Sequence, residues 1–355
     1  MKHENSRRDF LQSVSGFAAL ASLGAISLPA LARAQDAAPG GEKNAGAKPL
    51  ERRKFGKTDM TVALLGFGSA EIGYQSIEQA TVDKLLGAAL DAGLNVIDTA
   101  ECYLESEVQI GKAVAHRRKE FYLFTKCGHI AEDGSRQAAW TKKAILASLD
   151  RSLERLKTDA VDLFQLHSCS KEELEKGECI EAMEAAKKSG KTRYIGYSGD
   201  SAAALYAIES GRFDALQTSV NFCDQECITL TLPKAKERGM GVIAKRPIAN
   251  AVWRYDALPD NGYHQEYWKR FDALKYEFAQ GEARKREDEG GPAGVAMRFT
   301  AMQPGVCVLI VGTTRPERWK QNADLLRAGP LAAELEAKIR ARWKEVAKAE
   351  WIGQT

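Results

Sequence analysis

Short apolar runs recur along most of this chain, and segments with helical spacing of apolar residues separate them. Both faces of each run are mostly apolar, which is typical of parallel strands that are covered on both sides. We therefore expect eight strands, at residues 62–68, 94–100, 121–126, 161–167, 192–198, 215–220, 241–245 and 307–312.

The segments between these runs have the pattern of amphipathic helices. In residues 140–156, for example, Ile145, Leu149, Leu153 and Leu156 fall on one face. Several of the segments end at a glycine, the residue that most often terminates a helix. The expected helices cover residues 77–93, 140–156, 171–189, 201–211, 231–239, 292–303 and 316–326.

Eight such repeats predict an α/β fold, a closed (β/α)8 TIM barrel. Residues 52–62 precede the barrel and read as a hairpin with its turn near Gly56 to Asp59. The alternative fold is a doubly wound sheet, whose dinucleotide fingerprint needs three spaced glycines. The segment Gly66-Phe67-Gly68-Ser69-Ala70-Glu71 lacks the third glycine, so the barrel is favoured.

Two extra segments decorate the expected barrel. Residues 247–291, after the seventh strand, are longer than an ordinary connection and contain a predicted helix. Its apolar stripe comprises Tyr267, Phe271, Leu274 and Phe278. Two placements remain open at this stage, over the barrel mouth or packed on the outside. Residues 330–352 end the chain with a further predicted helix.

Composition and charge exclude several classes of protein. The chain has 355 residues, of which 44% are hydrophobic and 28% are charged, as in ordinary globular proteins. Its net charge is +3, and residues 1–34 contribute four basic and two acidic side chains, so the remainder carries +1. A net charge this close to zero does not indicate a protein that binds nucleic acid.

The seven cysteines are scattered, with no CxxC pair and no zinc-binding spacing, which argues against a disulfide framework and a structural metal site. Cys223 and Cys227 are four residues apart and can share a helix face, so a metal or disulfide role stays open for them. Packing is the simpler interpretation, because a free cysteine behaves as a small apolar residue.

The N-terminus has the pattern of an export signal. Arg7-Arg8 with Phe10 and Leu11 precede an uncharged stretch that runs from Phe10 to Ala32, and Ala32-Arg33-Ala34 offers a cleavage site. This arrangement resembles a twin-arginine (Tat) signal. The alternative is an uncleaved membrane anchor, for which the glycines, serines and Pro29 are unfavourable.

We therefore expect a signal peptide at residues 1–34, a flexible linker at 35–49 and the barrel at 50–355. The signal implies the Tat export machinery as a partner, a periplasmic or exported location, and no stable membrane span after cleavage near Ala34-Gln35. Nothing in the sequence indicates the oligomeric state.

Polar residues stand where the expected strands end, and these ends build the active site of a TIM barrel. Asp98 ends the second strand, with Tyr103 just beyond it; Lys126 ends the third strand and His167 the fourth. Singly, Asp98 could be a helix cap, Lys126 a solvated strand end and His167 a core histidine. Together they place an acid, a phenol, an amine and an imidazole at one mouth.

These four groups suit proton transfer to a carbonyl oxygen. An ordinary tyrosine has a pKa of about 10 and is a weak acid near neutral pH. We expect the ammonium of Lys126 to lower the pKa of Tyr103, Asp98 to keep Lys126 protonated, and His167 to orient the substrate. No nucleophile elbow or carboxylate pair for glycoside hydrolysis is present.

Three motifs resemble aldo-keto reductase signatures: Ile97-Asp98-Thr99-Ala100-Glu101-Cys102-Tyr103, Phe124-Thr125-Lys126 and Asp162-Leu163-Phe164-Gln165-Leu166-His167. The resemblance extends from Arg52 nearly to the C-terminus. It implies that Asp98, Tyr103, Lys126 and His167 are catalytic, and that the substrate is a small carbonyl compound or alcohol.

The resemblance also implies a nicotinamide cofactor, NADP (NADPH) with NAD as a possibility. Ser198 and Gln217 are similar to residues that hold the carboxamide, with Asn221 close by. The segment 311–322 is similar to the family's adenosine phosphate loop and helix start, and a helix N-terminus with an arginine can receive a phosphate. The implied contacts are Gly312, Thr313, Arg318, Gln321 and Asn322.

Several positions depart from the family pattern. The glycine that commonly follows the tyrosine is Leu104, and the asparagine that commonly follows the serine is Gly199. The stacking aromatic is replaced by Lys245 within Ala244-Lys245-Arg246-Pro247-Ile248, so Lys245, Arg246 and Ile248 become candidates for the cofactor site. The lysine that often holds the 2′-phosphate is Gly312, which leaves NADP preference to Arg318, with Arg315 as a second candidate.

From these observations we expect an NADP(H)-dependent oxidoreductase that reduces an aldehyde or ketone, or runs the reverse reaction. The alternative is a non-catalytic nicotinamide-binding sensor or partner protein built on the same barrel.

Overall fold

The computed structural model describes residues 48–285 and 290–354. The predicted export signal at 1–34 and nearly all of the predicted linker at 35–49 lie outside the described residues. Within the described ranges, no helix combines the length and apolar character that crossing a membrane requires.

Eight parallel strands form a closed barrel in the order β10-β3-β4-β5-β6-β7-β8-β9. This confirms the predicted fold and excludes the doubly wound sheet. Interior and helix-facing positions are both buried, as the apolar runs require. The strands are β3 (Leu65–Gly68), β4 (Val96–Asp98), β5 (Tyr122–Cys127), β6 (Val161–His167), β7 (Thr192–Ser198), β8 (Ala215–Ser219), β9 (Gly241–Lys245) and β10 (Val306–Val311).

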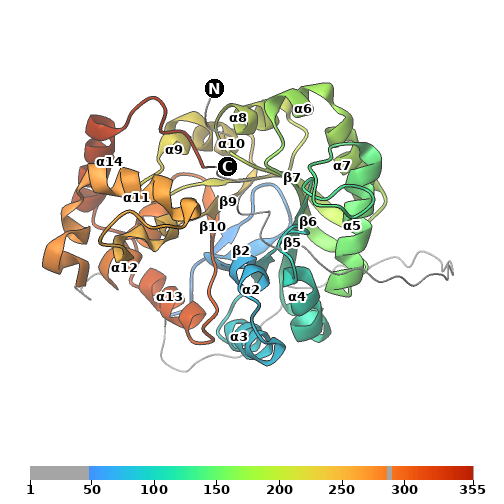
Figure 1. Ribbon diagram of the computed structural model, residues 1–355, viewed down its shortest axis with the longest axis horizontal. Coiled ribbons are helices and arrows are strands. Elements are labelled where there is room, and N and C mark those ends of the chain that lie inside the picture. The colour runs from blue at the N-terminus through green and yellow to red at the C-terminus, as the bar shows by residue number, and fades with distance from the viewer. Residues whose placement is uncertain (1–47, 286–289, 355) are drawn as a thin grey trace.

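Helices surround the strands (Figure 1). In α5, Thr141 caps the N-terminus by accepting a hydrogen bond from the Ala144 amide at 3.3 Å, and Ile145 and Leu149 are fully buried against the barrel. The helices around the barrel are α2 (Ala70–Tyr74), α3 (Gln79–Asp91), α4 (Ser106–Val114), η1 (Ala115–Glu120), α5 (Lys142–Leu156), α6 (Lys171–Lys176), α7 (Glu178–Lys188), α8 (Ser201–Ser210), α9 (Glu226–Leu230), α10 (Leu232–Glu237), α12 (Gly291–Met302) and α13 (Arg318–Arg327).

Two expected helices differ from the structure. The helix expected at 171–189 is interrupted at Gly177, whose φ of +83° ends α6 and starts α7. The helix expected at 231–239 is preceded by the short α9, and Pro233 stands in the first turn of α10, where its missing amide donor is tolerated.

A hairpin covers the barrel at the N-terminal ends of its strands, with β1 (Arg52–Lys54) antiparallel to β2 (Thr61–Ala63). The sequence predicted this hairpin. Phe55 and Met60 in its turn are fully buried. Gly56 has a φ of +56°, and a side chain there would meet the backbone of Gly241 at 2.4 Å. Only glycine allows the turn to approach the strands this closely.

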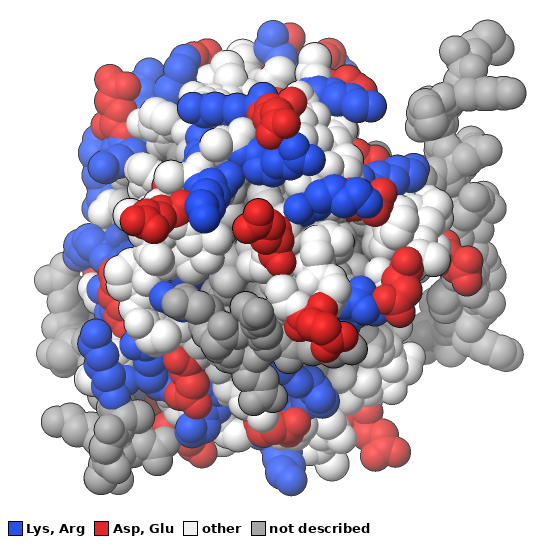
Figure 2. Space-filling model, turned by 90° about the vertical axis from the view of Figure 1, so that its left-hand side faces the viewer, with Lys and Arg blue, Asp and Glu red and all other residues white. Residues whose placement is uncertain are grey.

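The insertion and the C-terminal helix form a second hydrophobic core beside the barrel. Its main elements are η2 (Ala249–Arg254), α11 (Gly262–Leu274), η3 (Glu277–Ala279), η4 (Gly281–Lys285) and α14 (Ala333–Val346). Tyr267, Phe271 and Leu274 pack there, as the apolar stripe predicted, whereas Phe278 follows α11 and lies in η3. Acidic and basic side chains are interspersed on this face (Figure 2).

Neither of the two placements that the sequence left open, over the mouth or on the outside of the barrel, describes the whole insertion. Its bulk packs beside the barrel, but Tyr263 at the start of α11 accepts a hydrogen bond from Arg246, which follows β9. Tyr263 therefore reaches the rim of the mouth. The helix expected at 330–352 ends at Val346, and the chain then turns back over the strands, with its end near β9 (Figure 1).

Candidate active site

A buried ion pair joins the ends of β4 and β5. The Lys126 ammonium lies 2.5 Å from one Asp98 carboxylate oxygen and donates to the Thr99 carbonyl at 2.8 Å. The other carboxylate oxygen accepts from the side-chain amides of Gln217 at 3.0 Å and Gln165 at 3.3 Å. Both charged side chains are almost completely buried.

Burial raises the pKa of Asp98, and the Lys126 ammonium, together with the two glutamine amides, opposes that rise. The pair is held by direct contact and by hydrogen bonds on both oxygens. Removing either partner would leave an uncompensated charge in the barrel.

Tyr103 places its phenol against this pair. Its hydroxyl lies 3.5 Å from the Lys126 ammonium, which is also 4.9 Å from the ring centre. The backbone at Tyr103 is held between neighbours: its amide donates to Ala100 and its carbonyl accepts from Ser106. A side chain at Gly73 would meet that carbonyl at 1.9 Å, so α2 can approach Tyr103 only because Gly73 lacks one.

The pKa of Tyr103 is raised well above 10, chiefly by burial and then by the negative charge of Asp98. The net shift is therefore upward, opposite to the lowering expected from Lys126, because burial and Asp98 outweigh the effect of the ammonium in the resting structure. The reason is geometric, since Lys126 lies 2.5 Å from Asp98 but 3.5 Å from the phenol, so its charge is largely matched. Tyr103 stays protonated and is poised as a donor.

Leu104 adopts the left-handed backbone conformation, with a φ of +48°. This explains why a glycine suits the position after the tyrosine, since a residue with a side chain is strained there by about 1–2 kcal/mol. The turn keeps its shape despite the substitution, and the strain is carried by Leu104.

His167 stands at the end of β6 and presents its ring edge to Tyr103, with 5.7 Å between ring centres. Its Nδ1 lies 3.5 Å from the Cys102 thiol, and the His129 ring is 4.8 Å from the His167 ring. Burial raises the pKa of Cys102 to about 12, so this thiol is neutral and not a nucleophile.

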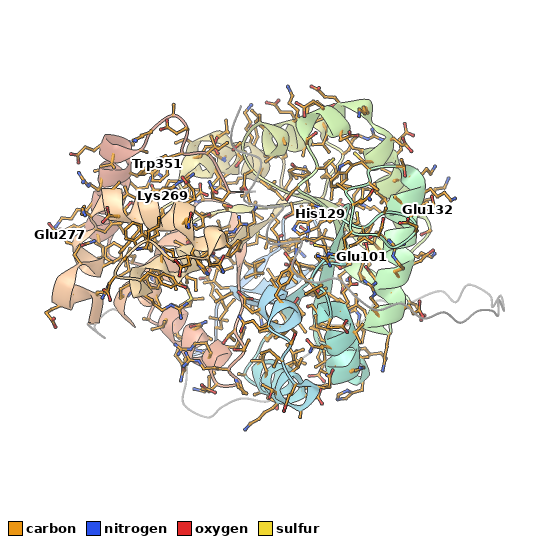
Figure 3. The ribbon with its side chains drawn as sticks, viewed as in Figure 1. Glu101, His129, Glu132, Lys269, Glu277 and Trp351 are labelled. Atoms are coloured by element: carbon orange, nitrogen blue, oxygen red, sulfur yellow. The ribbon has the colours of Figure 1, made fainter. Side chains whose placement is uncertain are left out.

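Sequence reasoning missed Cys102, His129 and the aromatic neighbour Tyr74, whose ring lies 5.8 Å from Tyr103. The signal available for Cys102 and His129 was their position soon after a strand, whereas Tyr74 ends helix α2 and carried no such signal. Figure 3 shows His129 near the strands, with Glu101 close to the same side of the barrel.

Two buried acids support the loop that carries Tyr103. Glu101 forms an ion pair with Arg151 at 2.5 Å, and Glu107 accepts a hydrogen bond from Thr125 at 2.6 Å. Burial raises the pKa of Glu107. The acidic helix start in the sequence therefore anchors α4 and its preceding loop to α5 and β5.

Ser198 and Gln217 meet at the ends of β7 and β8. The Ser198 hydroxyl donates to the Gln217 side-chain oxygen at 2.8 Å, and Gln217 in turn donates to Asp98. The structure thus connects these two predicted carboxamide-binding residues directly to the Asp98–Lys126 pair. Asn221, by contrast, bonds the backbone of Arg246 and Cys223 and acts within the loop.

The charged residues after β9 have partners within the chain. Lys245 forms an ion pair with Asp200 at 2.7 Å, and burial lowers the pKa of Lys245 to about 8. Arg246 donates to the Tyr263 hydroxyl at 3.1 Å. Ile248 packs between the main and second cores, so its contacts are apolar.

The loop after β10 and the start of α13 form the last part of the mouth. Gly312 and Thr313 precede α13, whose first residue is Arg318. The Nε of Arg318 is buried with no hydrogen-bond partner. Asn322 is buried on α13, whereas Gln321 is exposed.

Glu71 of α2 occupies the space beside Gly312. A side chain at position 312 would meet a carboxylate oxygen of Glu71 at 1.7 Å. Burial raises the pKa of Glu71. An acid therefore stands where the resemblance places a phosphate-binding lysine.

The residues at the mouth fit a nicotinamide dinucleotide at its two ends. The buried Ser198–Gln217 pair offers amide and hydroxyl groups, and the unpartnered Arg318 Nε at a helix N-terminus suits a phosphate. The carboxylate of Glu71 opposes a phosphate beside Gly312. Across the described part of the chain, no group of three or more His, Cys, Asp or Glu side chains is placed to hold a metal ion.

The seven cysteines, all within the described ranges, are free thiols. Cys223 packs in the second core and Cys227 in the main core. They do not face each other across one helix, so packing accounts for both.

Comparisons with known proteins agree with this geometry. Residues 64–344 match the model of the aldo/keto reductase family. The chain is 28% identical over 295 residues to the uncharacterized oxidoreductase YqkF of Bacillus subtilis, covering 80% of this chain and 94% of that protein. It is 26% identical over 323 residues to a D-threo-aldose 1-dehydrogenase of a Pseudomonas species, covering 82% and 95%.

An L-galactose dehydrogenase of Arabidopsis thaliana is 30% identical over 225 residues, covering 59% of this chain and 69% of that protein. Among solved structures, the holo form of the aldo-keto reductase AKR11C1 from Bacillus halodurans superposes with a TM-score of 0.69 at 25% identity. That match covers 85% of this chain and 99% of the solved chain. The chain belongs to the aldo/keto reductase family.

Proposed function

We propose that this protein is an NADP(H)-dependent oxidoreductase that reduces an aldehyde or ketone to the alcohol, or catalyses the reverse. The observation that carries the proposal is the convergence of Asp98, Tyr103, Lys126 and His167 at one mouth, with the Tyr103 hydroxyl 3.5 Å from the Lys126 ammonium. Family membership supports an oxidoreductase of this class.

Each of these residues has a role in moving one proton. Tyr103, protonated because its pKa is raised, donates to the carbonyl oxygen of the substrate. Lys126 stabilises the phenolate that forms, since an ammonium at this distance favours the charged phenol. Asp98 holds Lys126 in place, and His167, whose ring lies against Tyr103, orients the carbonyl. When bound, reduced nicotinamide supplies the hydride.

The cofactor proposal rests on the residues at the ends of β7 to β10. We assign the carboxamide to Ser198 and Gln217, and the 2′-phosphate to Arg318, whose Nε has no partner. Glu71 works against a phosphate near Gly312, so we expect it to reduce the preference for NADP over NAD.

The relatives guide the choice of substrates. Two of them carry names of dehydrogenases acting on sugars, L-galactose and D-threo-aldoses. We therefore propose small polyhydroxy aldehydes and their cyclic forms as the first substrates to test. Tyr74 and His129 beside Tyr103 and His167 supply ring faces and edges against which such a ring can pack.

The test is NADPH oxidation, and NADP reduction, by purified protein against a panel of aldoses, aliphatic aldehydes, ketones and quinones. We expect turnover with at least one carbonyl class and its loss in Tyr103→Phe. Tight NADPH binding without oxidation across the whole panel would contradict the proposal and favour a nicotinamide-binding sensor.

Export is a separate proposal. The sequence pattern at Arg7-Arg8 supports Tat-dependent transport of the folded barrel. We expect the parent chain in the periplasmic fraction and an Arg7→Lys/Arg8→Lys variant in the cytoplasmic fraction. Equal distribution of the two chains would refute it.

A further inference from the structure

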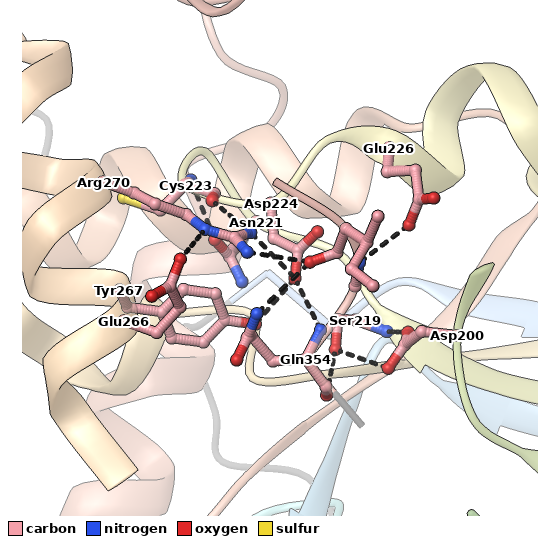
Figure 4. A network of polar contacts seen from close by, with 12 residues as sticks. Asp200, Ser219, Asn221, Cys223, Asp224, Glu226, Glu266, Tyr267, Arg270 and Gln354 are labelled. Atoms are coloured by element: carbon pink, nitrogen blue, oxygen red, sulfur yellow. Dashed lines mark hydrogen bonds and ion pairs between the residues drawn. The ribbon is translucent and has the colours of Figure 1, made fainter. Parts of the chain in front are cut away.

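The chain after α14 returns to the mouth of the barrel, and we call its last described segment, Ile352 to Gln354, the C-terminal strap. Three backbone contacts anchor it: Arg270 donates to the Ile352 carbonyl at 2.8 Å, the Gly353 amide donates to Glu226 at 2.7 Å, and the Gln354 amide donates to Asp224 at 3.2 Å. Figure 4 shows this network.

Two of the three anchors, Asp224 and Arg270, are themselves buried. Asp224 is fully buried and also accepts from the Tyr267 hydroxyl at 2.9 Å. Arg270 is 1% exposed and lies 5.7 Å from the ring centre of Trp351, which packs on Trp343. The strap is therefore held mainly by interior groups, with the partly exposed Glu226 as the third anchor.

The last described carbonyl, that of Gln354, points at the cationic residues after β9. It accepts hydrogen bonds from Lys245 at 3.0 Å, from Ser219 at 3.1 Å and from Arg246. The amides of the strap thus donate to acidic side chains, and the Gln354 carbonyl accepts from cationic side chains. A neutral peptide satisfies both kinds of charge in this part of the mouth.

The order of the strands shows what this contact blocks. Ser198 and Gln217 end β7 and β8, Lys245 ends β9, and Gly312 and Arg318 follow β10. A dinucleotide that joins the first two residues to the last two must cross the end of β9. Its pyrophosphate would need Lys245 and Arg246, the donors that the Gln354 carbonyl holds.

We propose that the C-terminal strap competes with the dinucleotide for Lys245 and Arg246, so that cofactor binding requires the strap to leave the mouth. This inference rests on the proposed function, because it concerns the same cofactor site. The apparent affinity for cofactor is then lowered by the fraction of molecules in which the strap is displaced.

The chain offers a direct way to displace the strap. A side chain at Gly353 would meet the Cβ of Asp200 at 2.3 Å, so Gly353→Val forces the segment away without changing Lys245 or Arg246. Gly87→Val is the matched control, because position 87 on α3 has no atom near an added Cβ. Glu226→Ala removes the Gly353 anchor by a different route.

The measurement is the dissociation constant and association rate of NADPH, by nucleotide fluorescence with the purified full-length variants. We expect Gly353→Val and Glu226→Ala to bind about tenfold tighter and associate faster, the shift produced if the displaced state is about a tenth of the population. Gly87→Val is expected to match the parent chain. Unchanged or weaker binding in both strap variants would overturn the inference.

Hydrogen exchange of the Gly353 and Gln354 amides gives a second readout that does not depend on a variant. In the parent chain both amides are expected to be protected without cofactor and to lose protection when NADPH is added. Protection that persists at saturating NADPH would contradict the proposal that the strap leaves the mouth when the cofactor binds. Failure of every variant to bind NADPH or NADH would instead refute the proposed function.

Discussion

The mouth of the barrel has two halves that differ in how their charges are paired. In the half with the proposed catalytic residues, which we call the catalytic half, at the ends of β4 to β6, Asp98 and Lys126 contact each other across adjacent strands. Tyr103 packs on Lys126, and His167 packs on Tyr103. In the cofactor half, at the ends of β7 to β10, Lys245 is paired with Asp200 and with a carbonyl 109 residues away in the chain.

Most of the departures from the family pattern lie in the cofactor half, and Leu104, which follows Tyr103, is the departure in the catalytic half. The catalytic half keeps the four residues that we propose move one proton, which are Asp98, Tyr103, Lys126 and His167. The cofactor half has Gly199, Lys245 and Gly312 at altered positions, and Glu71, Asp200 and the strap occupy the space or bond the charges that result. Changes in the two halves should therefore have separable effects.

The largest effect is expected from Lys126→Met. It leaves the Asp98 carboxylate buried without its cation, so the free energy of unfolding should fall by about 3–5 kcal/mol. Denaturant unfolding measures it, and Asp98→Asn/Lys126→Met is the control. The double variant should recover much of the loss; a double variant as unstable as the single would show that the charge is not the cause.

A pH series should separate the halves next. Lys245 has a pKa lowered to about 8, so its charge is lost as pH rises through 8 and NADPH binding should weaken above that pH. Tyr103 has a raised pKa and stays protonated, so kcat for carbonyl reduction should not fall until pH exceeds 10. A kcat that falls near pH 8 at saturating NADPH would show that the two halves do not respond to pH separately.

A smaller effect is expected at Glu71. Replacing its carboxylate by Glu71→Gln removes a negative charge beside Gly312, worth about 1 kcal/mol near a phosphate in a wet site. NADPH should bind about fivefold tighter, while NADH changes less. Equal gains for both nucleotides in a titration would place Glu71 away from the 2′-phosphate.

The smallest effect is expected at Leu104, with its φ of +48°. Leu104→Gly relieves about 1–2 kcal/mol of backbone strain but gives back about 0.5–1 kcal/mol of chain entropy. The melting temperature should therefore rise by a few degrees at most. Leu104→Ala keeps the backbone strain and is the control. If the melting temperature rises equally in Leu104→Ala and Leu104→Gly, the cause is the loss of the leucine side chain and not the relief of strain.

The sequence was sufficient for the barrel and for bringing Asp98, Lys126 and His167 to one mouth, because each of these residues stands at the end of an apolar run and parallel strands bring those ends together. Local pattern could not predict the pKa of Tyr103, which depends on the depth of burial and on the balance between Asp98 and Lys126. Nor could it place Gln354 against Lys245, since that contact links distant segments through backbone atoms with no sequence signature. The break at Gly177 was visible only as a glycine within an otherwise helical pattern.

The central claim is that Tyr103 donates the proton while the cofactor half binds independently of it. Single-turnover oxidation of NADPH by an accepted carbonyl substrate, compared between the parent chain and Tyr103→Phe at equal cofactor occupancy, tests it most directly. We expect a rate lower by about 10²–10⁴-fold in the variant, with an unchanged dissociation constant for NADPH. An equal single-turnover rate in the two proteins would contradict it.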